Sequence, residues 1–284
     1  MDLKTTCRRI ESLKIQGADN VARSALEALL TVVNKSKARD KEHFMVEIDE
    51  VKVKLFLTRP TEPAMRNYLE HVTNQVRKTK QDYKPFAKKL IKELLKNQKQ
   101  SRKLIAKHGA KLAKNKTVFT HCHSGTAIDI IKKAKAQVHN TETRPLYQGR
   151  KTAKDLAKAR IKVTHYTDSQ ARIALKHTDL MIIGADAITY NRVYNKVGSE
   201  MLAIIAKTRK VPVYIAASLW KFDPHKEIIE ERSPKEVWER SPKGVKVMNY
   251  AFEKINFKLV KGIICEKGIL RPKKFVKLAR KTIL

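Results

Sequence analysis

Short apolar runs alternate with helical segments through the second half of the chain, and this alternation limits the possible folds more than any other feature. The runs predict a strand at Val118 and further strands over residues 161–166, 179–184, 211–217 and 260–265, with a short extended piece at 138–143. The segments between them have the apolar spacing of amphipathic helices. Strands that alternate with helices pair in parallel and are joined by right-handed crossovers. We therefore predict an α/β fold built on a parallel sheet.

The first part of the chain has a different pattern, because apolar residues recur there at helical spacing. Residues 44–55 fit either a helix or a strand, and a long basic helix or helix pair is predicted between residues 65 and 105. The sequence thus predicts a mainly helical domain over residues 1–115, followed by a Rossmann-like α/β domain over residues 116–284.

Positive charge dominates the composition. The chain carries 62 Lys and Arg residues against 28 Asp and Glu residues, which gives a formal net charge of +34. Such an excess is typical of a nonspecific nucleic-acid or membrane-surface binder, or of a lysine-rich surface that reflects genome or habitat. The lysines are spread over the whole chain and aromatic residues make up only 6%, which favours the lysine-rich surface. In either case the protein attracts phosphorylated small molecules.

Cysteine usage and hydropathy indicate a reducing compartment. Cys7, Cys122 and Cys265 are too few and too scattered for a disulfide framework or a paired-cysteine zinc site. No stretch approaches the roughly 20 apolar residues of a membrane span, and the N-terminus lacks the apolar core of a signal peptide. We expect a cytoplasmic protein with free thiols and no membrane contact.

The run His121-Cys122-His123 raises the question of a metal site, since imidazole and thiolate both bind zinc. On a strand, alternation puts the two histidines on one face and the cysteine on the other. No second paired cluster accompanies them. We therefore expect no metal.

Five polar residues follow predicted strands directly: Cys122, Glu142, Asp168, Asp186 and Ser218. The carboxyl ends of parallel strands meet at one edge of a sheet, and ligands bind there at a switch point of the topology. One pocket can therefore collect these residues. Taken alone, Asp186 fits a catalytic acid, a helix cap or an ion-pair partner.

The stretch from Val118 to Ala127 is an apolar strand, a polar turn and a helix start, with Ser124 as the expected N-cap. Free N–H groups at a helix start favour an anion such as phosphate, and they lower the pKa of a nearby thiol. The pattern therefore predicts either a reactive Cys122 or a buried structural cysteine.

Other polar loops have two interpretations each. Arg144, in the loop that also holds Gln148, either binds a phosphate or is tied to strand-end carbonyls. Asn195 and Lys196 either bind sugar hydroxyls and a phosphate or cap the helix that follows.

Two loops in the helical region carry further candidates. Gly17 precedes a helix whose N-cap we expect at Asp19 or Asn20, and it forms either a simple turn or a close backbone approach to an anion. Pro60 ends regular structure and presents Arg59 from a loop.

An ordered set of motifs runs along the second half of the chain: His121-Cys122-His123-Ser124, Glu142-Thr143-Arg144-Pro145 with Gln148-Gly149, Gly184-Ala185-Asp186, Asn195-Lys196-Val197-Gly198, Ala216-Ala217 with Lys221-Phe222, and Asn249-Tyr250-Ala251-Phe252. This set resembles the superfamily that joins the regulatory subunits of translation initiation factor 2B, methylthioribose-1-phosphate isomerase and archaeal ribose-1,5-bisphosphate isomerase. The resemblance is strong from about residue 117 to residue 272 and weaker before it.

The branch of the superfamily is indicated by single residues. The isomerases of the superfamily resemble one another in two residues, a cysteine on the first loop and an aspartate in the Gly-Ala-Asp motif. Regulatory subunits generally lack this pair. This chain has both residues, as Cys122 and Asp186. The His-Cys-His-Ser run, the Lys221-Phe222 pair, the modest length and the loop at Arg59 resemble the ribose-1,5-bisphosphate enzyme.

The resemblance implies Cys122 as proton acceptor and Asp186 as proton donor, with no cofactor. It implies substrate contacts at these positions: Gln16, Gly17, Ala18, Asp19, Arg59, Ser124, Gly125, Thr126, Arg144, Gln148, Asn195, Lys196 and Lys221. The Arg-Gly-Ala phosphate loop of the family reads Gln16-Gly17-Ala18 here, so a charged contact is missing unless Arg23 replaces it. For Asp186 to act as the acid, burial must raise its pKa.

The implied function is an aldose–ketose isomerase that converts ribose 1,5-bisphosphate to ribulose 1,5-bisphosphate in AMP and nucleoside degradation. Relatives associate through their α/β domains, which implies a homo-oligomer, either a dimer or a hexamer. Two alternatives stay open. One is a non-enzymatic translation regulator of the initiation factor 2B type, whose basic surface contacts nucleic acid, and the other is a methylthioribose-1-phosphate isomerase.

Overall fold

The computed structural model describes residues 1–225 and 230–283 and divides into two compact units. One unit comprises residues 1–101 and the C-terminal residues from 282 on, and the other comprises residues 102–281. The division falls inside helix α5 (Tyr83–Ala113), which contributes residues to both. A domain boundary at the end of that helix, after residue 115, stays a prediction.

The helical unit consists of four helices and the first part of α5. The four are α1 (Leu3–Glu11), α2 (Ala18–Lys35), α3 (Lys41–Thr58) and α4 (Pro63–Lys78). The basic segment after residue 65 is therefore a helix pair, α4 and α5. Within this unit α2 packs against α4 and α3, as the apolar periodicity predicts.

Helix α3 settles the ambiguity of residues 44–55. Phe44, Ile48, Val51 and Leu55 are all buried, and their spacing of three and four residues places them on one helical face. Asp40 caps the helix by accepting a hydrogen bond from the backbone N–H of His43 at 2.9 Å. A strand would have sent alternate apolar residues to the opposite face.

The N-cap of α2 differs from the prediction. Gly17, and neither Asp19 nor Asn20, is the capping residue, with a φ of 84° and no side-chain cap hydrogen bond. The Asn20 amide instead donates to the carbonyl of Gln16 at 3.0 Å. The helix thus begins two to three residues earlier than expected, because glycine adopts positive φ without steric cost.

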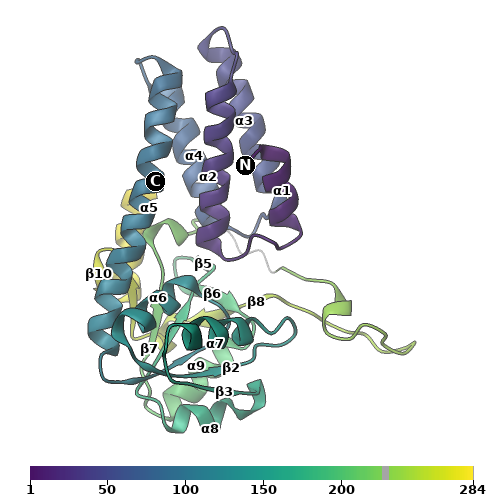
Figure 1. Cartoon of the computed structure of the whole chain (residues 1–284), viewed down its shortest axis with the longest axis vertical. Coiled ribbons are helices and arrows are strands. Elements are labelled where there is room, and N and C mark those ends of the chain that lie inside the picture. Colours follow the sequence, from purple (N-terminus) through teal and green to yellow (C-terminus); the bar gives the residue numbers. More distant parts are fainter. Residues whose placement is uncertain (226–229, 284) are drawn as a thin grey trace. The chain divides into compact units, whose positions relative to one another are not determined.

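The α/β unit is built on a seven-stranded sheet in the order β10-β9-β7-β4-β1-β2-β3. Figure 1 labels β10, β7, β2 and β3 of this sheet. Its strands are β1 (Thr117–Thr120), β2 (Gln137–Thr141), β3 (Val163–Tyr166), β4 (Leu180–Gly184), β7 (Val213–Ala216), β9 (Gly262–Cys265) and β10 (Gly268–Leu270). All pairs are parallel except β9 with β10. The predicted parallel α/β sheet is confirmed.

Helices cover both faces of this sheet. They are α6 (Gly125–Ala134), α7 (Gln148–Lys158), α8 (Ala171–Lys176), α9 (Ser199–Thr208) and α10 (Pro272–Ile283). Right-handed crossovers place α6 and α7 on one face and α8 and α9 on the other, because the strand order reverses direction between β3 and β4. In agreement, α6 packs on α7 and α8 packs on α9.

The core of the α/β unit lies between the central strands and α6 with the last part of α5. Ile105, Val118, Ile130 and Ile182 are buried members of one apolar cluster. A side chain at Gly109 would meet Ile130 at 2.5 Å, so glycine lets α5 approach α6 closely. Among residues 1–225 and 230–283, no helix is both long and apolar enough to cross a bilayer.

A second, three-stranded antiparallel sheet was not predicted. It consists of β5 (Ala187–Ile188), β6 (Arg192–Lys196) and β8 (Phe252–Asn256) in that order. These strands are two to five residues long, and β6 and β8 carry polar residues within them. Such short mixed segments have no apolar run that distinguishes them from a loop.

The switch point of the main sheet lies between β1 and β4. The chain leaves β1 toward β2 and β3, then returns to pair β4 with the opposite edge of β1. The carboxyl ends of β1 and β4 are therefore adjacent, and this is where open α/β sheets bind ligands.

Candidate active site

Cys122 and Asp186 each lie two residues beyond the ends of the neighbouring strands β1 and β4. The strands pair with Val118 opposite Leu180 and Phe119 opposite Met181, so the loops that follow leave the sheet side by side. An added Cβ at Gly184 would lie 2.5 Å from the hydroxyl of Ser124. Only glycine therefore allows the end of β4 to approach the loop after β1 this closely.

The backbone of Cys122 is held on both sides. Its φ is 62°, in the left-handed region that favours glycine. Its N–H donates to Thr143 Oγ1 at 3.0 Å, and its carbonyl accepts from Thr152 Oγ1 at 2.6 Å. These contacts fix the direction in which the half-buried thiol leaves the chain.

Burial raises the pKa of the Cys122 thiol to about 11, while the positive charge of Lys196 acts to lower it. The negative charges of Asp186 and Asp168 raise it further. The prediction that the helix start makes this thiol more acidic is therefore wrong. The loss of hydration outweighs the favourable charges because a thiolate is the charged form of the group.

Asp186 is anchored at the junction of the two sheets. Its backbone N–H donates to the carbonyl of Tyr194 at 2.9 Å, and the next residue, Ala187, pairs with Tyr194. In this antiparallel register Asp186 comes opposite Asn195. The pairing of β1 with β4 sets Asp186 beside the loop of Cys122, and Lys196 follows the β6 residue that is opposite Asp186. The charges of Asp186 and Lys196 both act on the pKa of the thiol.

Asn195 and Lys196 are the last residues of β6 and both are buried. The Asn195 amide donates to Ser199 Oγ at 2.9 Å, and that hydroxyl donates to the carbonyl of Lys196 at 2.6 Å. These contacts hold the turn into α9. The Lys196 ammonium lies 5.1 Å from the centre of the Phe252 ring, which offsets part of the cost of burying a cation.

Lys221 closes the same region from the other side of β4. It ends the short 3₁₀ turn Leu219–Lys221 that follows β7, and only 4% of the residue is exposed. Its ammonium donates to the carbonyl of Ala185 at 2.8 Å. A buried cation therefore sits one residue before Asp186.

Ser124, Gly125 and Thr126, whose substrate contacts stay predictions, lie at the N-terminus of α6. Ser124 caps the helix, with its hydroxyl accepting from the N–H of Ala127 at 3.3 Å, which confirms the predicted N-cap. A side chain at Gly125 would meet the guanidinium of Arg102 at 2.9 Å. Thr126 is buried.

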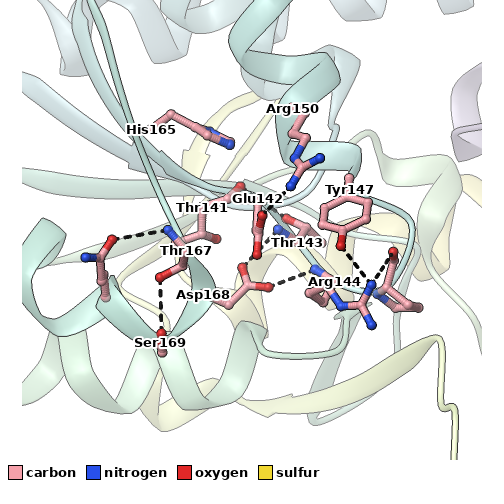
Figure 2. A network of polar contacts seen from close by, with 12 residues as sticks. Thr141, Glu142, Thr143, Arg144, Tyr147, Arg150, His165, Thr167, Asp168 and Ser169 are labelled. Atoms are coloured by element: carbon pink, nitrogen blue, oxygen red, sulfur yellow. Dashed lines mark hydrogen bonds and ion pairs between the residues drawn. The ribbon is translucent and has the colours of Figure 1, made fainter. Parts of the chain in front are cut away.

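Arg144 is used within the protein. Its guanidinium donates to Tyr147 Oη and to the carbonyl of Val237, each at 2.9 Å, as part of the network in Figure 2. Of the two interpretations of Arg144, phosphate binding and a structural role, these contacts fit the structural role. Its partners are not the strand-end carbonyls that were expected. Gln148 is the first residue of α7, and its buried Oε1 has no hydrogen-bond partner among residues 1–225 and 230–283.

Glu142 and Asp168, expected at strand ends, hold the loop after β2. Asp168 accepts from the backbone N–H groups of Thr143 at 2.9 Å and Arg144 at 2.7 Å. Glu142 pairs with Arg150 at 2.9 Å, and that guanidinium lies 3.7 Å from the centre of the Tyr147 ring. Figure 2 shows these side chains converging at the carboxyl ends of β2 and β3.

The two histidines beside Cys122 are tied to hydroxyl and backbone groups. His121 Nδ1 lies 2.9 Å from Thr141 Oγ1 and its Nε2 lies 3.0 Å from the carbonyl of Val197. His123 Nδ1 lies 3.0 Å from Thr152 Oγ1. Burial lowers the pKa of His121, and it lowers that of His123 to about 4. Within the described part of the chain, no three His, Cys, Asp or Glu residues are grouped as a metal site.

The candidates in the helical unit have partners close in sequence. Arg23 pairs with Glu27 at 2.8 Å on the exposed surface of α2. Arg59, with a side chain only 12% exposed, pairs with the buried Glu62 at 3.3 Å. Gly17 has open space around it, with the nearest atom 3.9 Å from an added Cβ. Substrate contacts from this unit, including those of Gln16, Ala18 and Asp19, stay predictions.

Thr143 and Thr152 were not predicted as functional residues. Their hydroxyls contact Cys122 from the loop after β2 and from α7. Such hydrogen bonds between distant segments leave no periodicity in the sequence. The one available signal was the place of Thr143 inside the Glu-Thr-Arg-Pro motif.

The sequence is similar to that of known proteins over most of its length. The family model described as the Initiation factor 2 subunit family matches residues 14–272. A ribose 1,5-bisphosphate isomerase of Thermococcus kodakarensis is 37% identical over 287 residues, which cover 93% of this chain and 89% of that protein.

The fold is also similar to solved structures. The translation initiation factor eIF-2B of Pyrococcus horikoshii OT3 has a TM-score of 0.83 at 26% identity, covering 96% of this chain and 98% of that one. The 5-methylthioribose 1-phosphate isomerase of the same organism has a TM-score of 0.81 at 25% identity, covering 99% of this chain and 88% of that one. Isomerases and a translation factor thus share this architecture.

Proposed function

This chain belongs to the Initiation factor 2 subunit family and is a sugar-phosphate isomerase, and we propose that it converts ribose 1,5-bisphosphate to ribulose 1,5-bisphosphate. One observation carries the proposal. A thiol, a carboxylate and a buried ammonium, from Cys122, Asp186 and Lys196, meet at the switch point of a parallel sheet. Identity also favours this substrate, at 37% to the ribose 1,5-bisphosphate isomerase of Thermococcus kodakarensis against 31% to the methylthioribose-1-phosphate isomerase of Desulforamulus reducens.

The proposed reaction moves two protons and uses no oxidant. A base removes the proton at C2 while an acid protonates the ring oxygen, so the ring C1–O bond breaks and a C1–C2 double bond forms. The base then returns its proton to C1, and the acid recovers a proton from the C2 hydroxyl as the C2 carbonyl forms. Both residues end in their starting state, as a catalyst must.

We assign Cys122 as the base and Asp186 as the acid. With a thiol pKa of about 11, the thiol is protonated near neutral pH in the ligand-free protein, so the base role requires loss of that proton when substrate binds. Lys196 supports this loss, because its ammonium favours the thiolate. The raised pKa equally supports a second assignment, in which Cys122 is the acid and Asp186 the base.

Buried cations suit the anionic substrate. Lys196 and Lys221 offer ammonium groups on either side of Asp186, where negative charge develops on O2 of the intermediate. The buried Oε1 of Gln148 is an acceptor for a sugar hydroxyl. We propose further phosphate contacts from Ser124, Gly125 and Thr126 at the start of α6, and from Arg59.

The direct test is formation of ribulose 1,5-bisphosphate by the purified protein, compared with Cys122→Ser and Asp186→Asn. We expect turnover by the wild-type protein and a loss of about 10²- to 10⁴-fold in each variant. Full activity in both variants would remove the assignment. Lys207→Met, which changes an exposed residue of α9, is the control and should keep wild-type turnover.

Hydrogen exchange separates the two assignments. Ribulose 1,5-bisphosphate is already open-chain, so exchange of its C1 hydrogen with D₂O bypasses protonation of the ring oxygen and starts when the base removes a proton from C1, with the acid assisting only at O2. If Cys122 is the base, Cys122→Ser should lose this exchange together with turnover, while Asp186→Asn should retain a larger share of exchange than of turnover. The opposite pattern assigns the base to Asp186.

The same assay decides between the alternatives. Turnover of methylthioribose 1-phosphate alone would favour that isomerase, and no turnover of any sugar phosphate together with salt-sensitive RNA binding would favour a regulator. We also propose that the chain forms a homo-oligomer, a dimer or a hexamer. Light scattering measures its mass, and a mass of 32.6 kDa, that of one chain, would exclude it.

A further inference from the structure

Cys122 and Thr143 share an unusual backbone conformation. Their φ angles are 62° and 61°, and neither residue is glycine. A β-branched residue such as threonine is a steric outlier in this region. Five other non-glycine residues of the described chain with positive φ lie one or two positions after a helix end, where this conformation is common: Leu13, Asn115, Lys135, Arg160 and Lys210. A sixth, Tyr147 with a φ of 56°, is the N-cap of α7 and ends the loop that begins with Thr143.

The two unusual residues contact each other directly. The N–H of Cys122 donates to Thr143 Oγ1 at 3.0 Å, across the gap between the loops after β1 and β2. On the other side, Thr152 Oγ1 donates to the carbonyl of Cys122 at 2.6 Å. We call Thr143 and Thr152 the threonine clamp, because their hydroxyls hold the N–H and the carbonyl of one residue.

The threonine clamp is itself held in place by Asp168, which follows β3. Asp168 accepts from the backbone N–H of Thr143 at 2.9 Å and from that of Arg144 at 2.7 Å, as Figure 2 shows. A carboxylate that binds two successive N–H groups stabilises the turn that gives Thr143 its positive φ. The loop is therefore fixed in the conformation that presents the hydroxyl to Cys122.

A second contact continues from the same hydroxyl. Thr143 Oγ1 accepts from Cys122, so its own proton is available for His121 Nδ1 at 3.3 Å or for the carbonyl of Thr141 at 3.4 Å. The other nitrogen of His121 lies 3.0 Å from the carbonyl of Val197, the residue after Lys196. One hydroxyl thus connects the loop that carries the thiol with the segment that carries the ammonium.

We propose that the threonine clamp positions the Cys122 thiol for proton transfer, with Thr143 and Thr152 as positioning residues that do not touch the substrate. The inference rests on the proposed isomerase function. Strained backbone persists only where its surroundings hold it, and such strain is concentrated at functional sites. A fixed thiol also lowers the cost of reaching the reactive geometry.

The test compares variants that differ only in one hydroxyl. Thr143→Val and Thr152→Val replace the hydroxyl with a methyl group, while Thr143→Ser and Thr152→Ser keep it. Thr178→Val is the matched control, because the Thr178 hydroxyl also donates to a backbone carbonyl and lies 3.4 Å from a histidine Nδ1, far in sequence from Cys122.

Two readouts are measured on the full chain. With ribose 1,5-bisphosphate, we expect both valine variants to lose about tenfold or more in kcat with little change in KM, and the serine variants to keep most of the activity. With iodoacetamide, followed by mass spectrometry of the Cys122 peptide, we expect faster alkylation in the valine variants only, because the released loop exposes the half-buried thiol.

Each outcome decides the question. Wild-type kcat and wild-type alkylation in both valine variants would overturn the clamp, as would an equal loss in the serine variants or in Thr178→Val. If the wild-type protein does not turn over ribose 1,5-bisphosphate, the proposed function fails. The alkylation rate of Cys122 then tests by itself whether the threonine clamp holds the thiol. If one valine variant does not fold by circular dichroism, the variant at the other threonine provides the same comparison.

Discussion

The two units of this protein use polar residues in different ways. In the α/β unit, Cys122, Asp186 and Lys196 come from three separate segments, yet their charges act on one another. In the helical unit, the predicted substrate residues Arg23 and Arg59 pair with residues three or four positions away.

The difference follows from the two architectures. A parallel sheet delivers the ends of distant segments to one edge, so residues far apart in sequence become neighbours. A helix brings together residues three and four positions apart, so its surface contacts are mostly local. We therefore expect the chemistry to depend on the α/β unit, and the helical unit to contribute to binding and to stability.

The largest expected effect is on kcat. Asp186→Asn removes a proton-transfer group of the α/β unit and should lower kcat by about 10²- to 10⁴-fold. Arg23→Met in the helical unit removes at most a binding contact, so it should raise KM and leave kcat unchanged. Steady-state kinetics with ribose 1,5-bisphosphate measure both. A kcat loss in Arg23→Met as large as that in Asp186→Asn would contradict the expected difference between the two units.

The next effect concerns the stability of the helical unit. Arg59→Met removes one ion-pair partner of Glu62, whose side chain is 1% exposed. Removing one member of a buried ion pair costs up to about 3 to 5 kcal/mol, so the free energy of unfolding in urea titrations should fall by more than it does in Arg23→Met. Arg23→Met is the control, because its exposed pair with Glu27 contributes about 0.5 kcal/mol or less. Equal losses in the two variants would contradict this expectation.

A smaller loss of stability is expected when one glycine in each unit is replaced by alanine. An added Cβ at Gly149 would lie 1.7 Å from the carbonyl oxygen of Thr141, so Gly149→Ala should destabilise the protein by about 3 kcal/mol. Gly17 has open space, but its φ of 84° with a ψ of 128° lies outside the left-handed helical region, so Gly17→Ala should cost about 1 to 3 kcal/mol of backbone strain. Thermal unfolding of the two variants measures the difference, and a larger loss in Gly17→Ala would reverse it.

The smallest effect is a shift in pH dependence. Lys196 lowers the pKa of the Cys122 thiol and Asp186 raises it. Lys196→Met should therefore raise that pKa above about 11, and alkylation of Cys122 between pH 8 and 9 should slow by roughly tenfold for a shift of about one unit. Asp186→Asn should shift the profile in the opposite direction.

The pH profile has a simple control. Lys207→Met removes an exposed cation of α9 that does not act on the thiol and should leave the alkylation profile unchanged. A slower reaction in this variant would mean that the overall positive charge, and not Lys196, controls the thiol.

Much of the main sheet was readable from the sequence, because each of its central strands is a continuous apolar run. The run at residues 179–184 became β4 and the run at residues 211–217 became β7. The three-stranded sheet was missed, since β6 contains Arg192, Asn195 and Lys196, its near partner β5 is only two residues long, and its other partner β8 is distant in sequence.

The candidate site was predictable in its residues and not in its electrostatics. Strand ends identified Cys122 and Asp186, because alternation of strands and helices fixes which residues reach the ligand edge. The pKa of the thiol was predicted in the wrong direction, because the helix start is visible in the sequence and burial is not. The N-cap of α2 was misplaced for a related reason, since Gly17 needs no side chain to begin a helix.

The amino-acid sequence by itself determined the helical and α/β parts, the order of the strands along the chain and the polar residues at their ends, because periodicity and turn chemistry are local properties. Only the tertiary structure decided that β4 returns to pair with β1, which threonine hydroxyls hold Cys122, and how burial changes its thiol. These depend on segments that meet only after folding, and the loss of water around a side chain is set by all of its neighbours at once.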